Sequence, residues 1–260
     1  MKSILKYLED RQDSIHALLG QPRKTSVFFH ALRVEIKKLH AVFDLIACCS
    51  KDFDKKKYFQ PFKKIFQQAG KVRELQVEEA FVKHYLPQNK IAGYRKKTRE
   101  IQAAEQAAFL SMIPEAMVSF LDKTFLEIKP FTIDMDDEKA AAYMRKKRKR
   151  IKKDLLQKTI KTAVLHQLRK RLKIYYYNQI ALNAERPPED SSQNNILPHL
   201  LGKWHDYEVT ANHLKELINS GDLKPIESKQ FEDLCTQILS GSNRVLLKIK
   251  KNIPSSEFLK

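Results

Sequence analysis

The segment His30–His40, His-Ala-Leu-Arg-Val-Glu-Ile-Lys-Lys-Leu-His, decides how the rest of the chain is interpreted. With 100° per residue, an α-helix through this segment has one apolar face. That face carries Leu32, Ile36 and Leu39. A row of cations about 80° wide borders the same face and consists of His30, Arg33, Lys37 and His40. Because the row borders the core instead of facing away from it, we expect it to meet a neighbouring element or a bound anion.

The pattern returns in the segment Leu165–Lys173, Leu-His-Gln-Leu-Arg-Lys-Arg-Leu-Lys, 136 residues after its first copy. The corresponding row consists of His166, Arg169 and Lys173. A second pair of similar segments follows in the same order, at an offset of 132 residues. Residues 69–74 read Ala-Gly-Lys-Val-Arg-Glu, and residues 201–206 read Leu-Gly-Lys-Trp-His-Asp. Two echoes in one order predict an internal duplication.

Helical periodicity extends over most of the chain and predicts an all-α protein. Only 6 of the 260 residues are glycine, which disfavours turn-rich sheet folds. We expect helices at residues 2–19, 25–49, 55–85, 92–122, 137–183, 193–219 and 226–250, with the fourth kinked or split at Pro114. The predicted architecture is one domain, residues 1–260, built as a duplicated helical bundle. Its two pseudo-symmetric halves, residues 1–125 and 138–260, are joined by a linker at 126–137.

The charge of the chain predicts a polyanionic partner. There are 49 lysines and arginines against 31 aspartates and glutamates, a formal net charge of +18. Such a charge attracts nucleic acid, anionic membranes and phosphate polymers. The glycine-rich phosphate loops of nucleotide-binding proteins are missing from the sequence, and no apolar run is long enough to span a membrane. Three cysteines, two of them adjacent, give no disulfide framework. We therefore expect a cytoplasmic protein without membrane association.

A second basic feature precedes the later copy of the motif. Eight of the nine residues from Arg145 to Lys153 are lysine or arginine. If one helix continues from this run to the second motif, a cationic strip about 37 Å long joins Arg148 to Lys173, at 1.5 Å per residue. This reading adds four candidate anion contacts: Arg145, Arg148, Lys149 and Lys152.

These motifs resemble those of the CHAD family, a duplicated all-helical domain known for binding inorganic polyphosphate. The resemblance covers residues 20 to 250 and rests on four motifs, His30-x-x-Arg33-Val34-x-x-Lys37-Lys38-Leu39, Leu165-His166-x-Leu168-Arg169-x-x-x-Lys173, Ala69-Gly70-x-x-Arg73-Glu74 and Leu201-Gly202-x-x-His205-Asp206. This sequence departs from the family pattern at four positions: His40, Ile174 and Tyr176 replace arginines, and Glu74 replaces an aspartate.

The resemblance implies that polyphosphate binds, without catalysis, in a basic channel between the halves. The expected contacts are His30, Arg33, Lys37, Lys38, His40, Arg73, Arg145, Arg148, Lys149, Lys152, His166, Arg169 and Lys173. No catalytic residue, metal ligand or cofactor is expected, and association with polyphosphate granules follows from the ligand.

Two other functions are compatible with the sequence. Aromatic residues lie among cations at 175–177 and 28–29, as in a protein that binds RNA or DNA without sequence preference, for which polyphosphate would compete. A metal-dependent phosphohydrolase is the other alternative, although the sequence lacks His-x-x-x-His and Glu-x-x-His pairs, and His205-Asp206 is the nearest approach to a ligand pair.

Overall fold

The computed structural model describes residues 2–86, 91–113, 115–133, 135–157, 160–183, 196–221, 223 and 225–259. These residues contain helices and no strand, which confirms the all-α class. The helices are α1 (Lys2–Leu19), α2 (Ser26–Cys49), α3 (Lys55–Tyr85), α4 (Ala92–Ser111), α5 (Glu115–Ile128), α6 (Pro130–Ile133), α7 (Asp137–Leu155), α8 (Thr162–Leu182), α9 (Ile196–Asn219) and α10 (Pro225–Asn252). Across the described residues, no helix has both the length and the hydropathy to cross a bilayer.

Short polar side chains fix where several helices begin. The Thr25 hydroxyl accepts a hydrogen bond from the Phe28 amide at the start of α2. The carboxylates of Asp54 and Asp136 accept from amides in the first turns of α3 and α7. Each cap satisfies one of the amides that a helix start leaves without an intrahelical partner.

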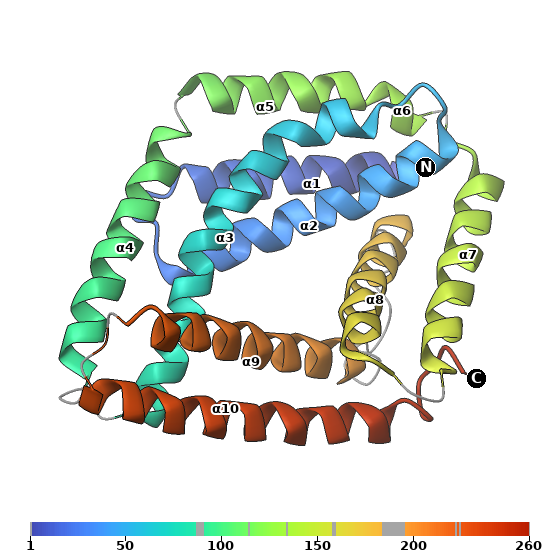
Figure 1. Cartoon of the computed structure of the whole chain (residues 1–260). Coiled ribbons are helices and arrows are strands. Elements are labelled where there is room, and N and C mark those ends of the chain that lie inside the picture. Colours follow the sequence, from blue (N-terminus) through green and yellow to red (C-terminus); the bar gives the residue numbers. More distant parts are fainter. Residues whose placement is uncertain are drawn as a thin grey trace.

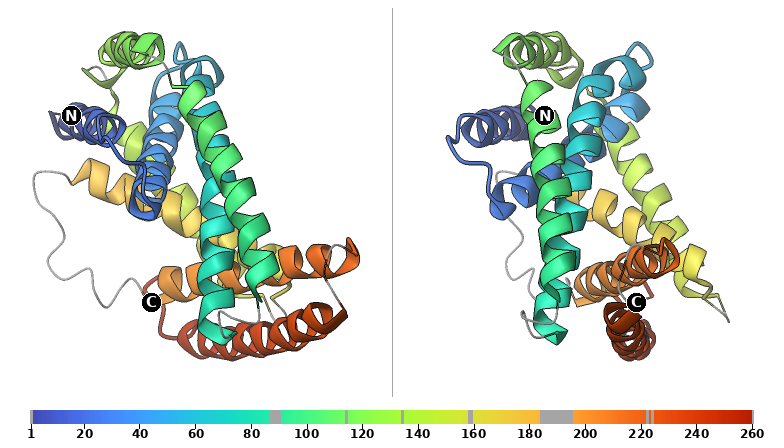
Figure 2. Two further views of the ribbon diagram at one scale, coloured as in Figure 1. Left: turned by 90° about the vertical axis from the view of Figure 1, so that its left-hand side faces the viewer. Right: turned by 60° about the vertical axis from the view of Figure 1, so that its left-hand side comes forward.

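The helices form two groups connected by long elements. Helices α1, α2 and α5 lie together at one end of the molecule, and α9 and α10 lie side by side at the other (Figure 1). The hairpin of α3 and α4 runs between the two groups, as both views in Figure 2 show. Helix α8 packs against α2 and α9, so it brings the second copy of the motif next to the first.

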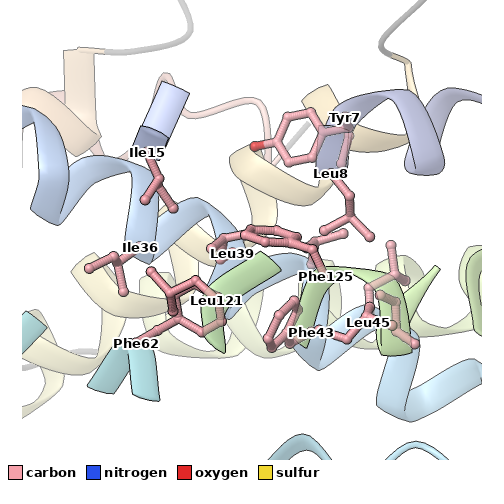
Figure 3. Close-up of a cluster of buried hydrophobic side chains, with 14 of the residues drawn as sticks. Tyr7, Leu8, Ile15, Ile36, Leu39, Phe43, Leu45, Phe62, Leu121 and Phe125 are labelled. Atoms are coloured by element: carbon pink, nitrogen blue, oxygen red, sulfur yellow. The ribbon is translucent and has the colours of Figure 1, made fainter. Parts of the chain in front are cut away.

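Two hydrophobic clusters form the core, and each takes residues from both halves of the sequence. The first cluster contains large side chains of α1, α2, α3 and α5, including Leu39, Phe43, Phe62 and Phe125 (Figure 3). It also takes Tyr143 from α7. The second cluster centres on α8, α9 and α10 and takes Val82, Ile91 and Tyr94 from the far end of the α3–α4 hairpin. Neither core is therefore complete without a segment of the other half.

An ion pair joins the first two helices of each half, with its charges exchanged. Arg11 on α1 donates to Glu35 on α2, with 2.9 Å between Nη1 and Oε2. In the second half, Arg171 on α8 donates to Asp154 on α7. Glu35 and Arg171 are separated by the 136 residues that separate the two motifs. The duplication thus preserves the position of the ion pair and reverses its polarity.

The expected helix over residues 137–183 is wrong. Helix α7 ends at Leu155 and α8 begins at Thr162. Asp154 and Arg171 form their ion pair across the two helices, whereas one continuous helix would hold them about 25 Å apart along its axis. The apolar positions keep their phase across the break, which is why periodicity alone missed it. A cationic strip from Arg148 to Lys173 therefore does not exist.

The other expected boundaries agree more closely with the structure. The predicted helix at 92–122 is split into α4 and α5, although Pro114 itself lies outside the described residues, as do residues 193–195 of the expected helix at 193–219. Within the predicted linker, residues 126–137, the structure places the end of α5 and the short α6.

Candidate anion-binding site

Cations from both halves gather where α2, α3 and α8 meet. We call them the α2–α8 cluster, which consists of Arg33, Lys37, Arg73, Arg169 and Lys173. Burial, followed by repulsion from Lys173, Arg33 and Arg169, lowers the pKa of Lys37 to about 7. Burial and Arg169 likewise lower the pKa of Lys173 to about 8. The two rows predicted from the sequence thus face one another closely enough to disfavour each other's charged forms.

Arg33 lies flat against α3, and Gly70 makes room for it. Its Nη1 donates to the Phe66 carbonyl at 3.1 Å, and its Cζ lies 4.3 Å from the centre of the Phe66 ring. A Cβ at position 70 would be 1.9 Å from that nitrogen. A glycine inside a helix normally destabilises it by about 1 kcal/mol, so this glycine has a positional reason. Arg33 is therefore partly engaged by the protein itself.

The second copy of the glycine has no such neighbour. A Cβ built at Gly202 on α9 meets nothing within 4 Å. Nearby, Arg169 carries a buried Nε and His205 a buried Nδ1, and neither atom has a hydrogen-bond partner among the described residues. Buried donors without partners are uncommon in folded proteins. The second half thus offers open space and unused donor capacity where the first half is filled by Arg33.

Two carboxylates oppose the cluster from within. Asp206 on α9 interacts with Arg169, Arg73 and Lys173, while its burial raises the pKa of the carboxyl. Glu74 favours the charged form of Arg33. Five cations face these two acids, so the cluster keeps an excess of positive charge. Such an arrangement can hold a multivalent anion through charge-assisted hydrogen bonds.

The histidines of the two motifs occupy different environments. His30 is exposed, and burial together with Arg73 and Lys37 lowers its pKa. His166 packs against Trp204, with 4.6 Å between ring centres, and against His205 at 5.3 Å. Burial, then repulsion by Arg169, lowers the pKa of His205 to about 3. All three histidines are therefore neutral at pH 7 in the absence of ligand.

Several residues predicted as contacts do not join the cluster. Lys38 pairs with Glu35 at 2.7 Å. His40 lies 3.0 Å from the Lys55 ammonium and packs against Phe59. The four predicted residues of α7, which are Arg145, Arg148, Lys149 and Lys152, are exposed, and none contributes to the electrostatics of Arg169 or Lys173. Arg148 instead donates to the Glu257 carbonyl at 2.7 Å and lies over the Phe258 ring.

Three residues that were not predicted as contacts belong to the site: Phe66, His205 and Asp206. The last two stand in the Gly202 motif, so the motif itself was the available signal. Phe66 precedes Gly70 by one helical turn and carried no charge or motif to identify it. Within the described residues, no group of three histidine, cysteine or acidic side chains could hold a metal ion. The expected absence of a metal stays a prediction.

The sequence resemblance agrees with a direct comparison. A family model described as the CHAD domain matches residues 7–215. The chain belongs to the CHAD domain family. Its structure is similar to the crystal structure of the CHAD domain from the plant Ricinus communis, with a TM-score of 0.67 at 16% sequence identity. That similarity covers 96% of this chain and 87% of the plant chain, and it shows a shared fold. Among curated proteins, none matches this chain in sequence.

In this CHAD domain the four family motifs meet in pairs. The His30 motif contacts the Gly70 motif through Arg33, and the His166 motif contacts the Gly202 motif through the His166 and His205 rings. Residues that are distant in the sequence therefore share one electrostatic environment, and the duplication places the two environments side by side.

Proposed function

We propose that this CHAD domain binds inorganic polyphosphate at the α2–α8 cluster without catalysing its turnover. The observation that carries the proposal is the convergence of lysines and arginines from both halves on half-buried positions, where burial lowers the pKa of Lys37 and Lys173. A protein does not keep partly desolvated like charges together without an opposing anion at low free-energy cost. A linear polyanion supplies that charge along its whole length.

The geometry favours a phosphate polymer over a small anion. The cluster takes cations from three helices, and the open side of Gly202 extends it toward α9. Phosphoryl oxygens accept strong hydrogen bonds from guanidinium and ammonium groups. Arg169 has unused donor capacity, so it is the residue that we expect to contribute most to affinity. By contrast, Arg33 already donates to Phe66 and contributes mainly to structure.

The test is a binding titration with long-chain polyphosphate on the full chain. The variant R169Q/K173Q removes two cluster charges, and the variant K215Q/K229Q removes two exposed charges on α9 and α10. We expect the cluster variant to lose at least tenfold in affinity and the control to stay within about twofold, because charge-assisted bonds each contribute roughly 1.5–3 kcal/mol. Equal losses for the two variants would refute the assignment. Competition with short phosphates separates a polymer site from a small-anion site.

A cytoplasmic location at polyphosphate granules is the setting that this function implies. Release of phosphate from polyphosphate by the purified protein with added magnesium or manganese would contradict the non-catalytic part of the proposal and support the phosphohydrolase alternative.

A further inference from the structure

The basic run on α7 stands apart from the α2–α8 cluster. One face of α7 packs inward with Tyr143, Ile151 and Leu155. Lys147 belongs to this face, 3.7 Å from an Asp44 oxygen and 4.7 Å from the centre of the Tyr143 ring. We call the opposite side the α7 outer face, which carries the exposed residues Arg145, Lys146, Lys149, Arg150, Lys152 and Lys153. In the described part of the chain, none of these six has an ion-pair or hydrogen-bond partner.

Helix α8 separates the α7 outer face from the α2–α8 cluster. Arg171 on α8 turns toward α7 and binds Asp154, whereas Arg169 and Lys173 turn toward α2 and α9. An open depression of about 490 Å³ lies between α7 and α8, lined by Arg150, Lys153, Asp154 and Arg171. Figure 1 shows α7 at the edge of the molecule. The α7 outer face is therefore accessible from outside and needs a separate explanation.

The charge density of this face calls for a polyanion. The six cations lie within nine residues, which is about 12 Å of helix, and cover an arc of about 160°. Three of their pairs, 145/149, 146/150 and 149/153, are like charges one turn apart. Each such pair destabilises an isolated helix by a few tenths of a kcal/mol. A partner that neutralises several of them at once would relieve this repulsion.

The width of the arc decides which polyanion fits. A single extended chain contacts one row of side chains and leaves the cations on the other flank unused. An α-helix fits the major groove of B-form DNA, about 12 Å wide, where phosphates line both walls. An arc of about 160° reaches both walls, because Lys152 and Arg145 project to one side and Arg150 and Lys146 to the other. The geometry thus favours a two-walled groove.

Other polyanions fit less well. The major groove of duplex RNA is deep and narrow, and side chains do not enter it readily. Single-stranded nucleic acid is held by stacking on aromatic rings, and residues 145–153 contain none. A membrane-binding helix presents an apolar face, whereas the one apolar residue of this run, Ile151, is buried.

We propose that the α7 outer face docks in the major groove of duplex DNA and contacts its phosphates without reading the base sequence. Four of the six cations are lysines, which act as point charges toward phosphate, and phosphate contacts carry no sequence information. This inference does not depend on polyphosphate binding at the α2–α8 cluster, since the two surfaces share no residue.

The test is fluorescence anisotropy with a labelled 20-base-pair DNA duplex and the full chain. The variant K146Q/K149Q/K153Q removes three charges from the α7 outer face. The control K96Q/K215Q/K229Q removes three exposed charges from α4, α9 and α10. With six phosphate contacts, the slope of log K against log salt is expected near −5, and the α7 variant should reduce it to about −3. At about 0.1 M salt the α7 variant should bind DNA at least tenfold more weakly, and the control should bind within about twofold of the parent.

Each result supports or overturns the proposal. Loss of DNA binding in the α7 variant, with polyphosphate affinity retained, supports it. Unchanged DNA affinity in that variant, or an equal loss in the control, overturns it. Parallel loss of DNA and polyphosphate binding also overturns it, because α7 would then belong to a polyphosphate surface. Duplex RNA of the same sequence that binds as tightly as DNA overturns the groove assignment. The variant R169Q/K173Q reports on the cluster separately, so failure of one proposal is distinguishable from failure of the other.

Discussion

Alanine at the two motif glycines is expected to change stability in opposite directions. Replacing glycine by alanine inside a helix stabilises it by about 1 kcal/mol when the methyl group has room. At Gly202 nothing lies within 4 Å of the new Cβ, so G202A should raise the free energy of unfolding by about that amount. At Gly70 the new Cβ would lie 1.9 Å from Nη1 and 3.2 Å from Cζ of Arg33, and the guanidinium must move away.

The magnitude at Gly70 follows from the contacts that Arg33 would lose. Its hydrogen bond to the Phe66 carbonyl, 3.1 Å long, involves a charged donor and contributes about 1.5–3 kcal/mol. Its position over the Phe66 ring contributes a further 0.5–1 kcal/mol, roughly. After the helical gain of about 1 kcal/mol is subtracted, G70A should lower the free energy of unfolding by about 1–3 kcal/mol.

Urea unfolding, followed by far-UV circular dichroism and by the fluorescence of Trp204, measures both variants. In the background R33A, which removes the clash, G70A should become neutral or stabilising, and this double-mutant cycle isolates the contact. If G70A and G202A shift the unfolding midpoint equally, or if the cycle shows no coupling, our account of why a glycine occupies position 70 is wrong.

Three further outcomes are expected. D206N should tighten polyphosphate binding by about 1 kcal/mol, roughly fivefold, because one opposing charge is removed, and weaker binding in a titration would show that Asp206 positions the cations instead. Polyphosphate affinity should rise as the pH falls from 9 to 6, since the pKa of Lys37 is about 7 and that of Lys173 about 8, and a bound polyanion favours their charged forms; a flat profile would contradict this. Glu78, 3.3 Å from His213, raises the pKa of that histidine, so its stabilising effect is present at acidic pH and lost as the pH rises through the raised value. H213Q should therefore destabilise the protein more at pH 5.5 than at pH 8 in thermal unfolding.

The pH window illustrates how the structure changed a sequence expectation. From the sequence, the histidines leading each motif were the natural titrating groups, because their unperturbed pKa lies near 6.5. In the folded protein, burial and neighbouring cations lower the pKa of His30, His166 and His205. Tertiary contacts shift the titration that matters near neutral pH to Lys37 and Lys173.

Local sequence features were sufficient for most of the helices. Capping residues such as Thr25 and Asp136, helical periodicity and the scarcity of glycine act over a few residues, so they were readable without coordinates. The break between α7 and α8 was not, because the apolar positions stay in phase on both sides of it and the ion pair that marks the turn joins residues 154 and 171.

The sequence by itself determined that this chain is helical, duplicated and strongly basic, since these properties depend on composition and on the spacing of neighbouring residues. Only the tertiary structure decided which cations face each other. Arg33 and Arg169 occupy matching positions in the two motifs, yet one lies on Phe66 and the other keeps a buried nitrogen without a partner. The difference arises because side chains from distant helices set the space, the burial and the electrostatic field at each position, and a helical wheel contains none of these.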